Sequence, residues 1–127
     1  MGQILQKFTV DFHISGALGA DLNIRWTIPS DCTLLHVSAV GSNDGDATFD
    51  LGTSSDTDGI LDGELVGDSN VPNEFDLDDF DGALVTDPGN EYPHFTDGTV
   101  MVLIVDYDGA SGTAAEDLTI VLTFSEG

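Results

Sequence analysis

The sequence has almost no basic residues. Lys7 and Arg25 are its only lysine and arginine, against 24 aspartates and glutamates, and the formal net charge is −22 over 127 residues. An acidic surface repels phosphate backbones and anionic lipid head groups, so the charge argues against nucleic acid and membranes as partners. Like charges also oppose compaction and self-association unless salt or divalent cations screen them. We therefore expect salt or calcium to affect stability, and a high-salt habitat is an open alternative explanation of the acid excess.

Cysteine and long apolar runs are also scarce. Cys32 is the only cysteine, so no disulfide can form within the chain, and we expect its side chain to act as a small hydrophobe at the end of a strand. The N-terminal residues Met1–Gln6 lack the basic region and apolar run of a secretion signal, and no run is long enough for a transmembrane helix. Apolar residues do not recur at helical spacing for more than about one turn, which argues against a helical fold.

The sequence is rich in strand patterning. Apolar and polar residues alternate with a period of two in residues 8–14, 22–28 and 118–124, as they do in half-buried β-strands. We predict that the first two of these segments pair as an antiparallel hairpin. Thr99–Val105 is a continuous, largely β-branched apolar run, typical of a central strand covered on both faces. The clear strand segments are 8–14, 22–28, 34–40, 49–51, 99–105 and 118–124.

The middle of the chain, residues 52–98, is rich in Asp, Gly, Asn and Pro. Its short apolar pieces at 60–66, 75–80 and 83–85 are predicted to be short strands or loop anchors. Strands at intervals of roughly 8 to 12 residues indicate a β-sandwich or barrel, and the chain length fits one domain. We therefore predict a single all-β domain over residues 1–127, with about six to eight antiparallel strands around one core and a long acidic loop region.

Closely spaced acids in the middle region suggest a metal site. Ser54–Leu65 nearly fits the calcium loop of helix-loop-helix proteins, but Ser54 replaces the first acidic ligand, Leu65 replaces the last, and no helix flanks the segment. A calcium-bound loop of a β-sheet is the alternative, because calcium takes oxygen ligands from flexible loops. Its candidate ligands are Asp56, Asp58, Asp62 and Glu64. The competing interpretation is that these aspartates are turn residues that cap their own backbone.

Two further groups in the middle region are candidate sites. The run Asp76–Asp81 is denser in charge and is a second candidate cation site. Aromatic side chains that lie exposed on loops would anchor a partner, because apolar patches are costly to leave in water. The candidate partner-binding residues of this kind are Phe75, Phe80, Tyr92 and Phe95. For Trp26, which shares a strand face with Leu22, Ile24 and Ile28, we expect core packing instead.

No motif indicates catalysis. His13, His36 and His94 lie far apart without metal-ligand spacing, so zinc is not expected. The sequence has no Gly-x-Ser-x-Gly elbow, phosphate-binding glycine loop or dinucleotide fingerprint, and Lys7 and Arg25 both fall on predicted strands. Without cationic groups, the stabilisation of a developing anion would depend on backbone amides or a metal. We therefore predict that the protein is not an enzyme and has no catalytic or cofactor-binding residues.

Three segments give the chain a resemblance of pattern to a known family: Lys7–Phe12, Trp26–Pro29 and Ala115–Phe124, which flank the Asp/Gly-rich middle. With these strands in place, the chain resembles the small jelly-roll decoration, or cement, proteins of tailed-phage capsids. The resemblance implies a jelly-roll-like β-sandwich without an active site, located in the virion on the outer capsid surface. It also implies the major capsid protein as partner and a homotrimer as the assembled form.

The predicted function is that of a non-enzymatic virion structural protein that decorates and stabilises the outer surface of a phage capsid. The alternative is a calcium-assisted carbohydrate-binding module or tail-fibre adhesin, in which calcium at Asp56–Glu64 or Asp76–Asp81 orders loops that hold sugar hydroxyls. An adhesin needs a ligand groove lined by exposed aromatics and ions, whereas a decoration protein needs a flat, partly apolar base. How copies with so few cations associate is left open by the sequence.

Overall fold

The computed structural model describes residues 6–127, so the interpretation of Met1–Gln6 as lacking a secretion signal lies, except for Gln6, outside the described residues. Residues 6–127 form nine β-strands and no helix, and thus no helix in this range is long and apolar enough to cross a membrane. The strands are β1 (Lys7–Ala17), β2 (Leu22–Thr27), β3 (Cys32–Val40), β4 (Thr48–Thr53), β5 (Asp56–Leu65), β6 (Asn73–Phe75), β7 (His94–Phe95), β8 (Val100–Asp106) and β9 (Glu116–Glu126).

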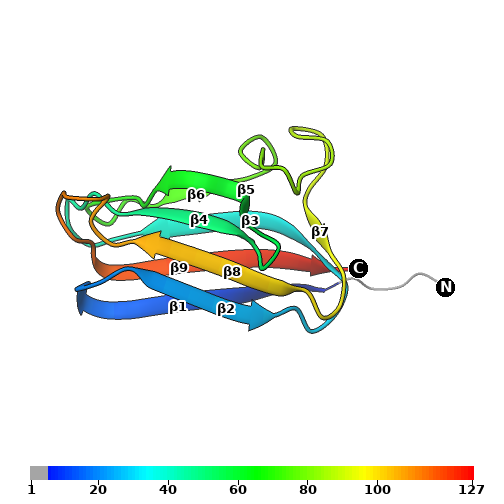
Figure 1. Ribbon diagram of the computed structural model, residues 1–127, viewed down its shortest axis with the longest axis horizontal. Coiled ribbons are helices and arrows are strands. Elements are labelled where there is room, and N and C mark those ends of the chain that lie inside the picture. Colours follow the sequence, from blue (N-terminus) through cyan, green and yellow to red (C-terminus); the bar gives the residue numbers. More distant parts are fainter. Residues whose placement is uncertain (1–5) are drawn as a thin grey trace.

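The strands form two antiparallel sheets packed face to face (Figure 1). One sheet has the order β1-β9-β3-β6, with the short β7 also paired to β3, and the other has the order β2-β8-β4-β5. The pairing is nested, because β1 pairs with β9, β2 with β8, β3 with β6 and β7, and β4 with β5. A long hairpin rolled up in this way is a jelly roll, so the predicted all-β, jelly-roll-like sandwich is confirmed. The strands outnumber the prediction because β6 and β7 are short separate pieces.

The period of two in the sequence corresponds to the inward and outward faces of the strands. In β1, Phe8 lies opposite Phe124 of β9, and their rings stack with centroids 5.2 Å apart. The alternate residues of β1 face outward, as His13 does opposite Thr119. The core lies between the two sheets, where the side chains of the central strands, such as Leu122, are fully buried.

The predicted hairpin between the first two strands is wrong. β1 pairs with β9 and β2 pairs with β8, so these consecutive strands lie in different sheets. Their apolar faces meet across the sandwich, where the ring centroids of Phe12 and Trp26 are 5.1 Å apart. Alternation identifies which residues face the core, but it does not identify the partner strand, because either pairing buries the same side chains.

β8 is the central strand that the sequence predicted, covered on both faces. Leu103 faces the core, whereas Val102 faces outward and is nevertheless fully buried. The neighbour of Val102 in β4 is Gly52, and a side chain at that position would collide with the backbone of Asp56 and Thr57. The start of β5 therefore folds closely over this sheet, and the absence of a side chain at position 52 makes room for it.

One lateral edge of the sandwich is closed by the acidic middle of the chain. Phe80 and Val85, from the segment between β6 and β7, are buried and form part of the core. The segment is held against β5 because the Leu84 N–H donates to the Gly59 carbonyl at 2.9 Å. We call this side, which comprises β5, β6 and residues 76–85, the β5–β6 edge.

The opposite edge, formed by β1 and β2, is open. Within the described chain each of these strands pairs on one side only. The inward-facing side chains pack against the core but are only partly buried; they are Phe8, Val10, Phe12, Ile14, Leu22, Ile24 and Trp26. Trp26, for which core packing was expected, has a buried Nε1 without a hydrogen-bond partner in residues 6–127. We call this side the β1–β2 edge; it runs along the lower side of the sandwich in Figure 1, with the β5–β6 edge along the upper side.

Candidate functional site

The predicted metal ligands lie along β5, at the β5–β6 edge. Asp56 begins the strand, and a hydrogen bond between its carboxyl group and that of Asp58 is the main cause that raises the pKa of Asp56 above its ordinary value. The pKa of Asp62 is raised mainly by the charges of Asp58 and Asp50. The pKa of Glu64 is raised by desolvation first and then by neighbouring aspartates. The group is thus a strip of carboxylates that repel one another.

The carboxylates of this strip do not converge on a common point. Among residues 6–127 there is no group of three or more His, Cys, Asp or Glu side chains positioned to hold a metal ion. Asp50, beside the strip, instead accepts a hydrogen bond from the Gly63 N–H at 2.6 Å. The segment that nearly fits a helix-loop-helix calcium loop is an edge strand, so its oxygens are spread along the strand. Calcium binding by Asp56, Asp58, Asp62 and Glu64 stays a prediction.

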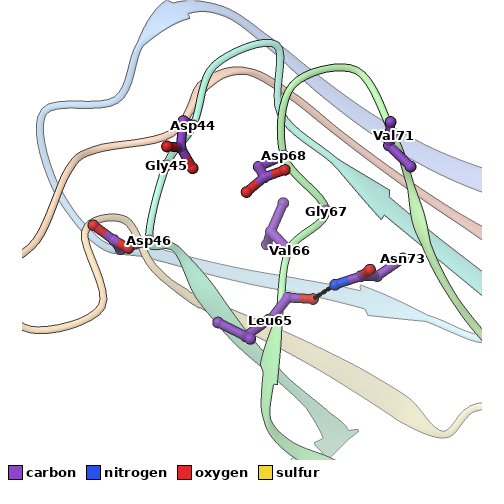
Figure 2. A pocket seen from close by; sticks show the side chains of 9 residues that line it. All are labelled: Asp44, Gly45, Asp46, Leu65, Val66, Gly67, Asp68, Val71 and Asn73. Atoms are coloured by element: carbon purple, nitrogen blue, oxygen red, sulfur yellow. Dashed lines mark hydrogen bonds between the residues drawn. The ribbon is translucent and has the colours of Figure 1, made fainter.

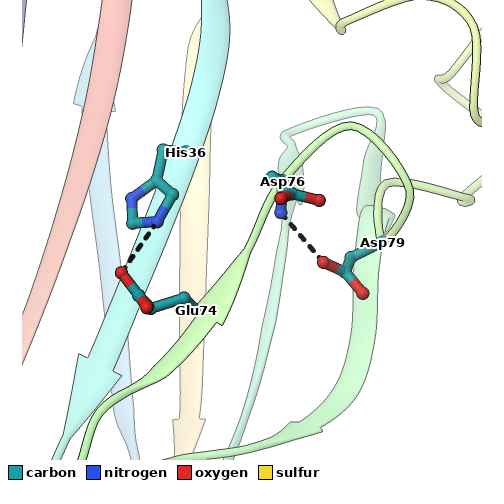
Figure 3. A network of polar contacts seen from close by, with 4 residues as sticks. All are labelled: His36, Glu74, Asp76 and Asp79. Atoms are coloured by element: carbon teal, nitrogen blue, oxygen red, sulfur yellow. Dashed lines mark hydrogen bonds and ion pairs between the residues drawn. The ribbon is translucent and has the colours of Figure 1, made fainter.

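The run Asp76–Asp81 begins with a hydrogen-bonded turn (Figure 3). The Asp79 carboxylate accepts a hydrogen bond from the Asp76 N–H at 2.9 Å, and the Asp76 carboxylate accepts one from the Asp78 N–H at 3.3 Å. Nearby, Nε2 of His36 in β3 lies 3.3 Å from Oε1 of Glu74 in β6, which is a surface contact between neighbouring strands. The turn matches the interpretation of closely spaced aspartates as residues that cap their own backbone.

The structure corrects the expectation that the aromatic side chains of the middle region are exposed. Phe75, Phe80 and Phe95 are 7%, 0% and 5% exposed and belong to the core. They are buried because β6, β7 and the segment between them fold back over the sandwich, where Phe75 packs edge-on against Phe49 of β4 at 5.4 Å between centroids. Partner binding through these three side chains depends on their exposure, so Tyr92, which is 40% exposed, is the candidate that remains.

A depression of about 250 Å³ lies where the connections after β3 and β5 meet, at one end of the sandwich (Figure 2). Three carboxylates line it, those of Asp44, Asp46 and Asp68, and the exposed side chains of Leu65 and Val71 form its apolar part. A hydrogen bond to Asp68, followed by the charge of Asp68, raises the pKa of Asp44. The polar groups of the lining include these carboxylates, so its chemistry suits a cationic or neutral hydrogen-bond donor.

Cys32 and His13 carry side chains that act as nucleophiles or bases in other proteins, but here one is buried and the other is held by hydrogen bonds. Cys32 is fully buried at the start of β3, as expected, and burial together with the Asp31 charge raises its pKa to about 11. Its thiol is therefore protonated at neutral pH, whereas a nucleophile requires the thiolate. The two ring nitrogens of His13 are hydrogen-bonded to Thr119 at 2.7 Å and to Ser15 at 3.2 Å.

The β1–β2 edge was not predicted as a surface from the sequence. The available signal was that Lys7 and Arg25 both fall on predicted strands. Only the sheet order shows that these two strands lie at the same edge of the sandwich. Across residues 6–127, the one contact within 4.0 Å between a basic side chain and a carboxylate is that of the His36 imidazole with Glu74, so neither Lys7 nor Arg25 contacts a carboxylate. The edge therefore combines partly exposed apolar side chains with Lys7 and Arg25, which contact no carboxylate within residues 6–127.

No family model matches the sequence, and no curated protein matches it. Among solved structures, the chain is similar to one in the cyanophage Pam1 capsid asymmetric unit, with a TM-score of 0.54 and 9% sequence identity. The similarity covers 97% of this chain and 85% of that chain. It extends over nearly the whole jelly roll, and at this identity it shows a shared fold.

Proposed function

We propose that the protein is a non-enzymatic structural protein of a phage virion, which decorates and stabilises the outer surface of the capsid. The observation that supports this most is the fold that it shares, over 97% of its length, with a chain of the cyanophage Pam1 capsid asymmetric unit. A fold does not by itself determine function, so the proposal also depends on the chemistry of the surface.

The charge of the protein supports a location outside the capsid. The interior of a capsid is filled with nucleic acid, whose phosphates repel a chain with a net charge of −22. On the outer surface the same charge faces solvent, where it keeps particles apart and soluble.

The hydrogen bonds of the aspartates support a structural role. The Asp117 carboxylate at the start of β9 accepts hydrogen bonds from the Gly16 N–H and from the Ser42 hydroxyl, each at 2.8 Å, and thereby joins β9 to the end of β1 and to the connection after β3. These bonds lower the pKa of Asp117 below its ordinary value. The Asp46 carboxylate similarly accepts a hydrogen bond from the Thr113 N–H at 2.7 Å. Acids used in this way hold loops in fixed positions, as a rigid surface protein requires.

The proposed partner is the major capsid protein, and the proposed decorating unit is a homotrimer. A stable attachment needs roughly 800 Å² of contact surface on each partner. Tyr92, in the segment before β7, is the candidate anchor because it is exposed and because tyrosines contribute strongly at the centres of interfaces.

The test is immunogold electron microscopy of virus particles from the source culture, with antibody raised against the recombinant protein. We expect label spread evenly over the heads, and pre-adsorption of the antibody with the recombinant protein should remove it. Label at tail tips would contradict decoration and favour the adhesin. Particles without label would overturn the virion role and favour a secreted sugar-binding protein.

A further inference from the structure

We propose that copies of the protein contact one another through the β1–β2 edge, which docks head to tail onto the acidic β5–β6 edge of a second copy. The inference rests on the proposed homotrimer and names the two surfaces that would form it.

The two edges differ sharply in charge. β1 and β2 hold both cations of the chain, Lys7 and Arg25, and one acid, Asp11; every other acid among the 24 lies elsewhere. The β5–β6 edge is dense in acids, which include Asp56, Asp58, Asp62, Glu64, Glu74, Asp76, Asp78, Asp79 and Asp81. The two edges lie on opposite sides of the sandwich (Figure 1), so Lys7 and Arg25 lie on one side and a dense group of acids lies on the other.

Both cations are available to a partner. Lys7 and Arg25 are exposed, and no carboxylate of the described chain lies within 4.0 Å of either. Their cross-strand neighbours are uncharged, since Lys7 lies opposite Ser125 and Arg25 lies opposite Val102. Lys7 and Arg25 therefore form no ion pair within residues 6–127, and the carboxylates of a second molecule can pair with them.

The two edges also differ in how completely their apolar side chains are buried. At the β5–β6 edge Phe80 and Val85 complete the core from outside the strands. At the β1–β2 edge Leu18, in the connection between the two strands, is buried, but seven inward-facing apolar side chains of the strands themselves stay partly exposed. Contact with another protein would remove this remaining apolar surface from water, which is favourable.

Charge complementarity identifies a second copy as the occupant. At the β5–β6 edge the acids repel one another, and a cation placed among them relieves that repulsion. Two β1–β2 edges facing each other would bring cations against cations, which is unfavourable. The contact is therefore heterologous, and successive heterologous contacts form a closed ring where the rotation between copies allows it. Three copies joined in this way form the proposed homotrimer if each copy is rotated by a third of a turn relative to the last; without that rotation, edges on opposite sides of the sandwich build an open filament.

The test measures self-association of the full chain by sedimentation over a range of protein and salt concentrations. We expect the wild-type chain to form an oligomer, and Arg25→Glu to weaken its association by at least about tenfold, because it places like charges across the contact. Arg25→Gln should cause a smaller loss. The matched control is the double variant Ser111→Glu/Thr113→Glu, which adds the same charge in the connection between β8 and β9 and should associate as the wild type does.

A charge swap within one chain distinguishes docking from the effect of net charge. Arg25→Glu/Asp62→Lys restores complementarity between the two edges and should recover association. Arg25→Glu/Glu91→Lys has the same net charge, but its lysine lies off β5, and it should not recover. Thermal melts of all variants establish that each is folded.

Three outcomes would overturn the inference. If Arg25→Glu associates as the wild type does, the surfaces are assigned wrongly, while particle labelling still decides the virion role. If the wild-type chain stays monomeric under every condition, the head-to-tail contact and the homotrimer both fail, again without deciding that role. If Arg25→Glu remains oligomeric but no longer binds particles, the β1–β2 edge contacts the capsid instead.

Discussion

Replacement of Phe80 by alanine should destabilise the whole sandwich, although Phe80 lies outside the strands. Its side chain is 0% exposed and completes the core at the β5–β6 edge. A change from buried phenylalanine to alanine costs about 3–5 kcal/mol, from lost burial and from the cavity left behind. Because total stability is typically about 5–15 kcal/mol, this is a large share of the free energy of unfolding. The melting temperature should fall by roughly 10–20 °C.

Urea unfolding followed by Trp26 fluorescence measures this effect well. Trp26 is the only tryptophan and lies in β2 at the opposite edge, so its transition reports unfolding of the sandwich rather than local opening near Phe80. Tyr92→Ala is the matched control, an aromatic in the same segment that is 40% exposed, and it should cost about 1–2 kcal/mol. An unchanged Trp26 transition in Phe80→Ala would refute the reasoning, because the segment would then unfold independently of the sheets.

Three further predictions concern a glycine, pH and calcium. Gly52→Ala should destabilise the protein by at least about 1–3 kcal/mol in thermal melts, because the added carbon would meet the backbone of Asp56 and Thr57. Gly19→Ala, where the added carbon meets no atom within 4 Å, should be neutral or slightly stabilising, and equal effects would contradict the close approach at Gly52. Stability should rise as pH falls from neutral to about 4, because the raised pKa values of Asp56, Asp62 and Glu64 let the folded chain bind protons that the unfolded chain does not. Below pH 3.8, the ordinary pKa of aspartate, stability should fall again, because Asp106 and Asp117 have lowered pKa values in the folded chain and stabilise it only when ionised. A melting temperature that declines steadily from neutral pH downward would contradict this prediction. If Asp56–Glu64 binds calcium, calcium should raise the melting temperature more than magnesium does at equal ionic strength, and equal effects of the two ions would contradict a calcium site there.

The sequence predicted the strands and their inward faces well. Residues 8–14 lie in β1 with Phe8 facing the core, and Thr99–Val105 corresponds to the central strand β8. These predictions succeeded because a strand places alternate side chains on opposite faces, so the period of two follows from local geometry alone.

The exposure of the candidate aromatic side chains was predicted less well, because it depends on tertiary packing. Phe75, Phe80 and Phe95 lie in an acidic, loop-rich stretch that suggested exposure, yet they are core residues. No local pattern could show this, since the segment around them folds back onto sheets built from distant parts of the chain. For the same reason the sequence showed a dense run of acids around Asp56 but not that they are spread along an edge strand.

The amino-acid sequence by itself determined the acid excess, the absence of a disulfide and the residues that face the core, because each depends on residue type or on a local period. Only the tertiary structure decided which strands became neighbours, since β1 pairs with β9 across nearly the full length of the chain. That long-range pairing places Lys7 and Arg25 together on one open edge and most of the β5 and β6 acids on the opposite, closed edge. The charge asymmetry of this protein is therefore a property of its topology, because strands distant in sequence are brought to the same side of the sandwich only by folding.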